Sequence, residues 1–218
     1  MSGQEELQRA ARAWLEDFEA FGIEELPIAG VGEASSGDLE SVAAEAESCT
    51  RCTLHESRGC SVPGQGSASA RLMFVGEAPG ADEDREGLAF VGRAGQLLTR
   101  MIAAMGFSRE DVFIANILKC RPPQNRVPRP EEVVSCLPFL RRQIEAIGPQ
   151  VLVALGATAA KNLLGVEESV GRLRQRVHDL DGTPLVVTYH PSYLLRSPGE
   201  KKKAWEDLQR AMTFVDGP

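Results

Sequence analysis

The sequence predicts an α/β fold in which helices cover a parallel sheet. Short apolar runs rich in β-branched residues alternate with amphipathic helical segments from about residue 70 onward. These runs are continuous rather than alternating, which is typical of strands buried on both faces. A chain of 218 residues with 43% hydrophobic and 25% charged content is large enough for one such domain and an appendage.

Before the predicted sheet, the sequence indicates helices and a linker. Residues 4–20 carry apolar side chains at helical spacing, and residues 27–38 are typical of a flexible linker. A second short helix is expected over residues 39–47. We expect two parts, an acidic helical extension with its linker (1–48) and a catalytic or binding domain (49–218).

The predicted domain holds four strands and four main helices. The strands are expected at 71–76, 112–118, 151–155 and 185–189. The helices are expected near 96–105, 130–147, 157–164 and from about 200 to 214. The order predicts that the carboxyl ends of the strands meet at one edge of the sheet, where active sites of such folds lie.

The net charge of −7 is unevenly distributed. Residues 1–48 hold twelve acidic and two basic side chains, whereas residues 49–218 hold nineteen acidic and twenty-two basic ones. The mildly basic body is therefore compatible with an anionic partner such as nucleic acid. Three interpretations of the acidic segment stay open: docking of a protein partner, shielding of the basic face, or a solvated extension.

Four cysteines are spaced like ligands of a metal centre. Cys49 and Cys52 form C-x-x-C, and Cys120 and Cys136 follow far downstream. Iron–sulfur clusters tolerate such unequal spacing, whereas structural zinc sites more often use two short C-x-x-C pairs; zinc remains the alternative. Cys60 is expected not to bind metal. No secretory signal or membrane-spanning run is evident, so we expect a cytoplasmic protein with reduced thiols and no membrane partner.

Polar side chains follow the predicted strands. Glu77 lies in the loop G-E-A-P-G, where Gly76 and Gly80 allow close backbone approach to an anion or a water molecule. The loop lacks the G-x-G-x-x-G pattern, which argues against a dinucleotide cofactor. Glu77 is placed to act as a general base or to orient water, or the loop is an ordinary turn. The neighbouring residues 82–84 are expected to be solvated charges.

Three further side chains have both a structural and a functional interpretation. Phe90 is either core or a stacking surface for a planar ring. Asn116 either satisfies nearby backbone groups or binds the edge of a pyrimidine. His190 follows a buried strand and precedes a proline, so its ring is expected to project from the strand end.

Basic and apolar groups flank these residues. The segment 119–129 holds four basic side chains and no acidic one, which predicts either a solvated loop or contacts with phosphates. After His190, Ser192 could bond a phosphate. Leu194, Leu195 and Arg196 could fill or brace a gap in a stack of bases.

Six segments together resemble the family-4 uracil-DNA glycosylases, the iron–sulfur branch of the uracil-DNA glycosylase superfamily. They are C-x-x-C at 49–52, GEAPGADED at 76–84, FVGRAGQLL at 90–98, NILKCRPPQNR at 116–126, Cys136 and HPSYLLR at 190–196. The resemblance covers residues 49 to about 214 and leaves out residues 1–48.

The resemblance implies a three-layer α/β/α fold with a central four-stranded parallel sheet. It implies hydrolysis of the bond between uracil and deoxyribose in single- or double-stranded DNA, leaving an abasic site. The implied [4Fe–4S] cluster would be held by Cys49, Cys52, Cys120 and Cys136. The implied site residues are Glu77, His190 and Asn125 for catalysis, and Gly76, Ala78, Phe90, Asn116, Ser192 and Arg196 for binding.

Two departures separate the chain from other superfamily members. Ala78 follows Glu77 where some relatives have a polar group, so Glu77 is expected to carry more of the catalytic role. The loop after Asn116 contains no histidine, unlike that of a relative that crosslinks to uracil, so we expect turnover. The rival hypothesis is a non-catalytic iron–sulfur protein that binds DNA or senses redox state. We expect a monomer.

Overall fold

The computed structural model describes residues 36–215. The α-helices are α2 (Ser36–Ser48), α3 (Ala81–Glu86), α4 (Arg93–Ala104), α5 (Pro130–Ile147), α6 (Ala157–Leu164), α7 (Val170–Leu173), α8 (Pro191–Arg196) and α9 (Lys201–Met212). The strands are β1 (Gln65–Gly66), β2 (Leu72–Gly76), β3 (Phe113–Asn116), β4 (Val151–Leu155), β5 (Val177–Leu180) and β6 (Thr183–Thr188). Three 3-10 turns, η1 (Thr53–Glu56), η2 (Pro123–Asn125) and η3 (Pro198–Glu200), complete the described part.

The sheet is mixed and has six strands in the order β1-β3-β2-β4-β6-β5. Its four central strands are parallel, whereas β1 and β5 pair antiparallel at the two edges. The expected four-stranded parallel sheet is therefore the centre of a larger one, and the expectation of four strands in all is wrong. Each edge strand is short and pairs antiparallel with a central strand. Neither edge strand contains the continuous apolar run that marks a strand buried on both faces, so this signal does not reveal them.

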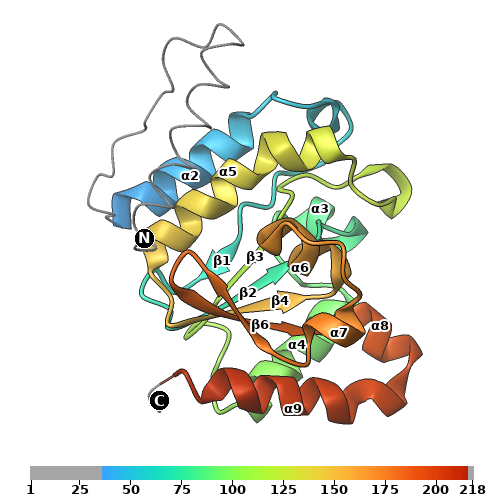
Figure 1. Cartoon of the computed structure of the whole chain (residues 1–218). Helices are drawn as coiled ribbons and strands as arrows, with labels where there is room; N and C mark the ends of the chain where they lie inside the picture. The colour runs from blue at the N-terminus through green and yellow to red at the C-terminus, as the bar shows by residue number, and fades with distance from the viewer. Residues whose placement is uncertain (1–35, 216–218) are drawn as a thin grey trace, which may run out of the picture. The chain divides into compact units, whose positions relative to one another are not determined.

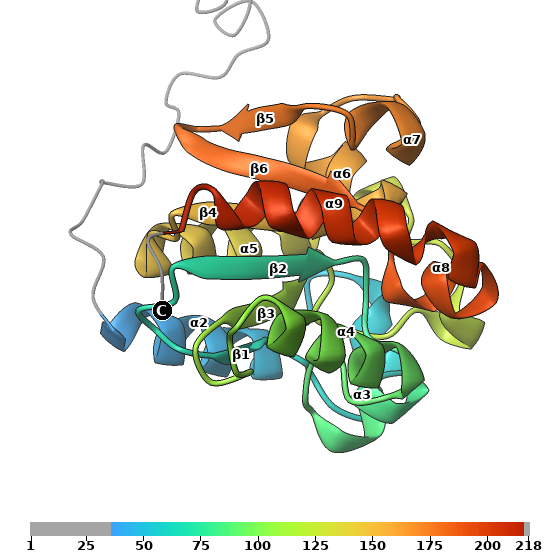
Figure 2. The same ribbon diagram turned by 90° about the horizontal axis from the view of Figure 1, so that it is seen from below.

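Helices cover both faces of the sheet (Figure 1). Met73 and Val75 of β2 belong to one buried cluster together with side chains of α2, α5 and α6. Leu72 and Phe74, the alternate residues of the same strand, belong to a second cluster with side chains of α4 and α9. Figure 2 shows α9 running along the sheet beside β4 and β6. Burial on both faces explains why the central strands are continuously apolar.

The edge hairpin β5–β6 had a sequence signal. Asp181 and Gly182 join the two strands with φ values of 51° and 90°. Two successive residues in the left-handed region form the tight hairpin turn that Asp-Gly favours. The short helices α3, α7 and α8 had no comparable periodicity.

The helix predicted over 39–47 is confirmed as α2, which begins at Ser36, inside the predicted linker. Val42 and Ala46 of this helix are fully buried against the first cluster. The predicted helix 4–20 and residues 27–35 of the predicted linker lie outside the described residues. The division of the chain at residues 48 and 49 stays a prediction.

Within residues 36–215, no helix is both long enough and apolar enough to cross a membrane.

Candidate active site

A cavity of about 520 Å³ opens where the four parallel strands end. Its walls come from the loops after β2, β3, β4 and β6, so the sheet itself brings together residues that are far apart in the sequence. The predicted site residues that line it are Glu77, Ala78, Phe90, Asn116, Asn125, His190, Ser192 and Arg196. The volume suits a small planar ligand.

Gly76, the remaining predicted binding residue, lies directly behind this wall. A Cβ atom at Gly76 would lie 2.4 Å from Asn116 Oδ1 and 2.6 Å from Phe90 Cζ. Only glycine leaves room for both side chains at their present positions, so Gly76 contributes by the absence of a side chain.

Asn116 lines the cavity and carries an unsatisfied polar atom. Its side chain is 1% exposed, and Oδ1 has no hydrogen-bond partner among the described residues. A buried acceptor without a partner costs free energy unless a ligand or water donates to it. The atom is therefore a candidate acceptor for an N–H group of a bound ring.

His190 is held as a neutral ring with a defined tautomer. Burial, with a smaller contribution from Arg196, lowers its pKa to about 4. The backbone N–H of Ser192 donates to Nδ1 at 3.1 Å, and the Ser192 hydroxyl lies 2.7 Å from the same nitrogen. Because Nδ1 accepts these hydrogen bonds, the proton of the neutral ring lies on Nε2. His190 therefore offers a neutral donor to the cavity.

Phe90 adopts a backbone conformation that bulky residues rarely adopt. Its φ is 53°, its side chain is 5% exposed, and its ring centroid lies 5.7 Å from that of His190. Such strain, which costs of order 1–3 kcal/mol, persists only where the surroundings hold the residue in place.

Two charged side chains hold the backbone around Phe90 from opposite sides. Arg109 donates to the carbonyl of Ala89 at 2.7 Å and to that of Phe90 at 3.2 Å. The Glu83 carboxylate accepts from the N–H groups of Val91 at 2.9 Å and Gly92 at 3.0 Å. We call Glu83 and Arg109 the Phe90 clamp.

The expectation that Glu83 is a solvated charge is therefore wrong. The same carboxylate also accepts from the N–H of Gly80 at 3.1 Å, so it joins the G-E-A-P-G loop to the Phe90 segment. A glutamate three residues after a residue that begins a helix commonly reaches back to that residue's N–H. This spacing, Gly80 to Glu83, was the sequence signal.

The basic segment 119–129 is buried at its first residue and exposed toward its other end. Lys119 is 1% exposed, and its ammonium donates to the carbonyl of Asn116 at 2.9 Å and to Gln143 Oε1 at 2.6 Å. Burial lowers the Lys119 pKa to about 8. Neither alternative for this segment, a solvated loop or contact with phosphates, holds for Lys119, because its side chain turns inward beneath the end of β3.

The exposed end of this segment borders the cavity. Arg121 Nε donates to Asn125 Oδ1 at 2.8 Å, and Asn125 has a φ of 54°. Arg126 lines the cavity and forms a two-point ion pair with Glu132 at 2.5 and 2.9 Å. These contacts fix the path of the loop beside the cavity.

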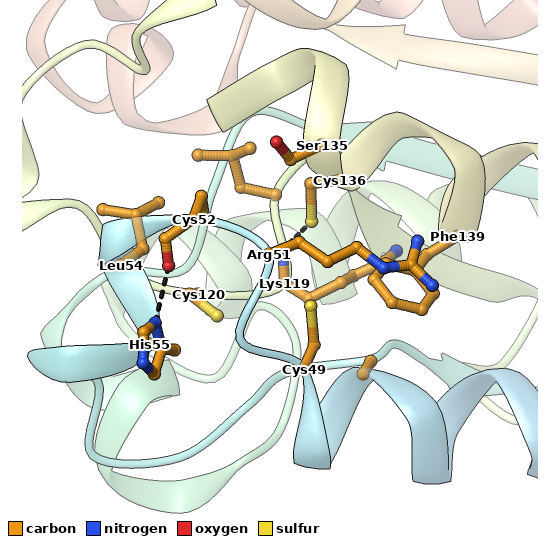
Figure 3. Close-up of a pocket in the computed structure, with 12 residues that line it drawn as sticks. Cys49, Arg51, Cys52, Leu54, His55, Lys119, Cys120, Ser135, Cys136 and Phe139 are labelled. Carbon is orange, nitrogen blue, oxygen red and sulfur yellow. Dashed lines mark hydrogen bonds between the residues drawn. The ribbon is translucent and has the colours of Figure 1, made fainter. Parts of the chain in front are cut away.

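The four predicted ligand cysteines line a second, small cavity between α2, η1 and α5 (Figure 3). Figure 3 shows the sulfur atoms of Cys49 and Cys136 pointing toward this shared space. The N–H of Lys119 donates to Cys136 Sγ at 3.2 Å, and Arg58 donates to Cys120 Sγ at 3.2 Å. Cys60 is exposed and does not line this cavity.

A family model described as the uracil DNA glycosylase superfamily matches residues 63–209. The chain belongs to the uracil-DNA glycosylase superfamily. Among characterised relatives, the type-4 uracil-DNA glycosylase of Thermotoga maritima is 45% identical over 81% of this chain and 94% of its own. That of Archaeoglobus fulgidus is 43% identical over 79% and 90%, and that of Pyrobaculum aerophilum is 42% identical over 83% and 95%. Within the superfamily, the chain therefore belongs to the type-4 branch.

The four thiols that line this cavity are the residues of this type-4 family member that could hold a metal centre. In residues 36–215, no three His, Cys, Asp or Glu side chains lie close enough together to hold one metal ion. A tetrahedral zinc site needs sulfur atoms only about 3.8 Å apart, given Zn–S bonds of about 2.3 Å. A cluster spreads its iron atoms and accepts wider spacing. N–H donors to two of the sulfurs are also typical of cluster sites.

Proposed function

We propose that the protein is a DNA repair glycosylase that binds uracil flipped out of DNA and hydrolyses its N-glycosidic bond, leaving an abasic site. One observation carries the proposal. The 520 Å³ cavity gathers a buried amide oxygen without a partner, a neutral histidine donor, an aromatic ring and a half-buried carboxylate. Each of these groups has a task in removing uracil, and its type-4 relatives carry that activity in their names.

Phe90 and Asn116 select the base in this proposal. The Phe90 ring stacks on the flipped uracil, an interaction that contributes about 1–3 kcal/mol per base. Asn116 Oδ1 accepts from uracil N3–H, and its amide nitrogen donates to O4. Cytosine presents an acceptor and a donor in the reverse positions, which leaves the buried Asn116 amide mismatched and disfavours binding.

His190 and Glu77 act on the bond in this proposal. The C1′–N1 bond breaks with its electron pair passing to uracil, and His190 Nε2–H donates to the uracil oxygen on which negative charge develops. Glu77 stabilises the positive charge on the sugar and orients the water whose oxygen attacks C1′. One water proton then passes to Glu77 and on to solvent. Asn125 supports the same water.

The remaining predicted residues bind the substrate or position the catalytic side chains. Ala78 has a small apolar side chain, so Glu77 is the catalytic group of this loop. Ser192 orients His190 through Nδ1, and Arg196 binds a phosphate beside the flipped nucleotide. That the protein acts as a monomer, and that the acidic segment docks a protein partner, stay predictions.

The four cysteines Cys49, Cys52, Cys120 and Cys136 would hold a [4Fe–4S] cluster. The cluster would tie three distant segments of the chain together. Catalysis does not pass through it.

Excision assays test the proposal. Purified protein is incubated with oligonucleotides that carry one uracil, single- or double-stranded, and abasic sites are cleaved with alkali. We expect Glu77→Ala and His190→Ala each to lower excision about 10²- to 10⁴-fold with DNA binding retained. Glu86→Ala, an exposed neighbour, is the control. No excision by unmodified, cluster-loaded protein would refute the function, and unchanged rates in both variants would refute the assigned roles.

A further inference from the structure

The leucines after His190 are poorly placed to fill a gap in a base stack. Leu194 is 1% exposed and packs in a small core with Leu97 and Ala204. Leu195 is partly buried against the same core. The expectation that Leu194 enters DNA is therefore at odds with its position, since exposing it would open that core.

Tyr193 lies at the rim of the uracil cavity. It is 37% exposed, whereas Asn116 and Phe90, which line the same cavity, are 1% and 5% exposed. The gradient of exposure places Asn116 and Phe90 at the floor and Tyr193 at the mouth. The Tyr193 N–H donates to the His190 carbonyl at 2.9 Å, so one helical turn carries both the proposed catalytic histidine and this ring.

The Tyr193 ring is supported from behind. Its centroid lies 5.1 Å from that of Tyr189, and the Arg174 guanidinium lies 5.6 Å from the Tyr189 centroid on the ring face. Arg174 in turn pairs with the fully buried Asp207 at 2.9 Å. An exposed ring with this backing can press on a base without displacing its own helix.

We propose that Tyr193 fills the gap that uracil leaves in the DNA stack when it flips into the cavity. This inference rests on the proposed function. Base flipping costs stacking energy, and a planar ring that takes the vacant place restores part of it, because every base offers a π face. In a single strand there is no continuous stack to restore, so Tyr193 matters only for duplex DNA.

Single-turnover excision from matched single-stranded and duplex substrates tests this role. We expect Tyr193→Ala and Tyr193→Gln to lower excision from duplex DNA about tenfold or more, as for loss of one base–aromatic stack, and to leave single strands nearly unchanged. Tyr193→Gln keeps most of the side-chain length in case Tyr193→Ala fails to fold. Tyr193→Phe should excise like the unmodified protein. Phe214→Ala removes an equally exposed aromatic ring that does not line the cavity and is the matched control.

Chemical rescue distinguishes stacking by Tyr193 from a purely structural role of this residue. A duplex with a pyrene nucleotide opposite uracil fills the stack itself and should restore excision by Tyr193→Ala. Equal losses on single and double strands, no loss on either, or absence of rescue would each overturn the role of Tyr193. Failure of the unmodified protein to excise uracil from either substrate would instead refute the proposed function.

Discussion

His190 shows how neighbouring groups fix the tautomer and charge of one residue for the role proposed above. A donor to a developing anion works best if it needs no rearrangement at the moment of reaction. Ser192 supplies both contacts on Nδ1, and burial disfavours the imidazolium, so the ring stands neutral with its proton on Nε2. The ring is thus in place before any substrate arrives.

We expect NMR titration to place the His190 pKa near 4, below the ordinary value of 6.5. The unfolded chain then binds more protons than the folded one between these values, so the stability from neutral His190 is complete above about pH 6.5 and is lost as the pH falls toward 4. His190→Gln should flatten this part of the unfolding profile. A His190 midpoint near 6.5, or Nδ1–H at pH 7, would contradict the assignment.

Gly76 makes the second prediction at the scale of one residue. An added methyl group would meet Asn116 Oδ1 at 2.4 Å and Phe90 Cζ at 2.6 Å. Gly76→Ala is expected to cost about 1–3 kcal/mol of stability by overpacking. It should lower excision about 100-fold because Asn116 and Phe90, the side chains proposed to bind the base, must move. Gly199→Ala is the control, because the added methyl group would meet no atom within 4 Å. It should change neither the stability nor the excision rate. Excision at the normal rate by Gly76→Ala would show that the two side chains can shift freely.

At the residue scale, the sequence could predict which groups surround the cavity but not what holds them. Glu77 and His190 follow apolar strands and Asn116 ends one, and parallel strands bring their ends to one edge. Glu83 and Arg109 bind backbone atoms of other segments, and the Lys119 ammonium binds the Asn116 carbonyl and the side chain of Gln143. Their contacts depend on loop conformations such as the left-handed Phe90, which no local pattern specifies.

At the scale of elements, the Phe90 clamp joins three segments. Glu83 belongs to α3, the Phe90 segment precedes α4, and Arg109 follows α4. The Glu83 carboxylate accepts hydrogen bonds from the N–H groups of the Phe90 segment, and the Arg109 guanidinium donates to its carbonyls. The two side chains should therefore act as a unit on the position of the Phe90 ring.

We expect Arg109→Ala and Glu83→Ala each to lower excision while the protein stays folded, since hydrogen bonds to charged groups contribute about 1.5–3 kcal/mol. The double variant should lose less than the two single losses combined, because either change already frees Phe90. Arg172→Gln, an exposed arginine on α7, is the control. Kinetics should show a lower kcat with DNA affinity nearly unchanged. Strict additivity would show that the two side chains act independently.

The sequence predicted the helices and strands that have a clear pattern of apolar residues. It did not predict a strand that forms only by pairing with a segment far away in the sequence. The four central strands and α5 follow from apolar runs and helical spacing. β1 has only two residues and exists because Gln65 and Gly66 pair with β3, which lies almost fifty residues further along the chain. Such a strand is specified by its partner and not by its own sequence.

At the scale of the whole molecule, the buried Lys119 connects the cysteine cavity, which it lines, to Asn116 in the wall of the larger cavity. The Lys119 N–H donates to Cys136 Sγ, while its ammonium donates to the carbonyl of Asn116. Arg58 likewise links Cys120 to the carbonyls at the end of α2. The cysteine site therefore connects the end of β3, α2 and α5, whereas Glu77 and His190, the groups proposed to break the bond, line the other cavity.

Loss of one predicted ligand should thus affect stability before chemistry. We expect Cys136→Ser to lose iron and visible absorbance and to melt at a lower temperature, because the three segments are no longer joined. Cys60→Ser changes an exposed thiol outside the site and is the matched control, with iron content and melting unchanged. At low temperature, the fraction of Cys136→Ser that stays folded should still excise uracil, since Glu77 and His190 are intact. Full iron content and normal melting in Cys136→Ser would remove Cys136 from the ligand set, and zinc in place of iron in the unmodified protein would refute the cluster.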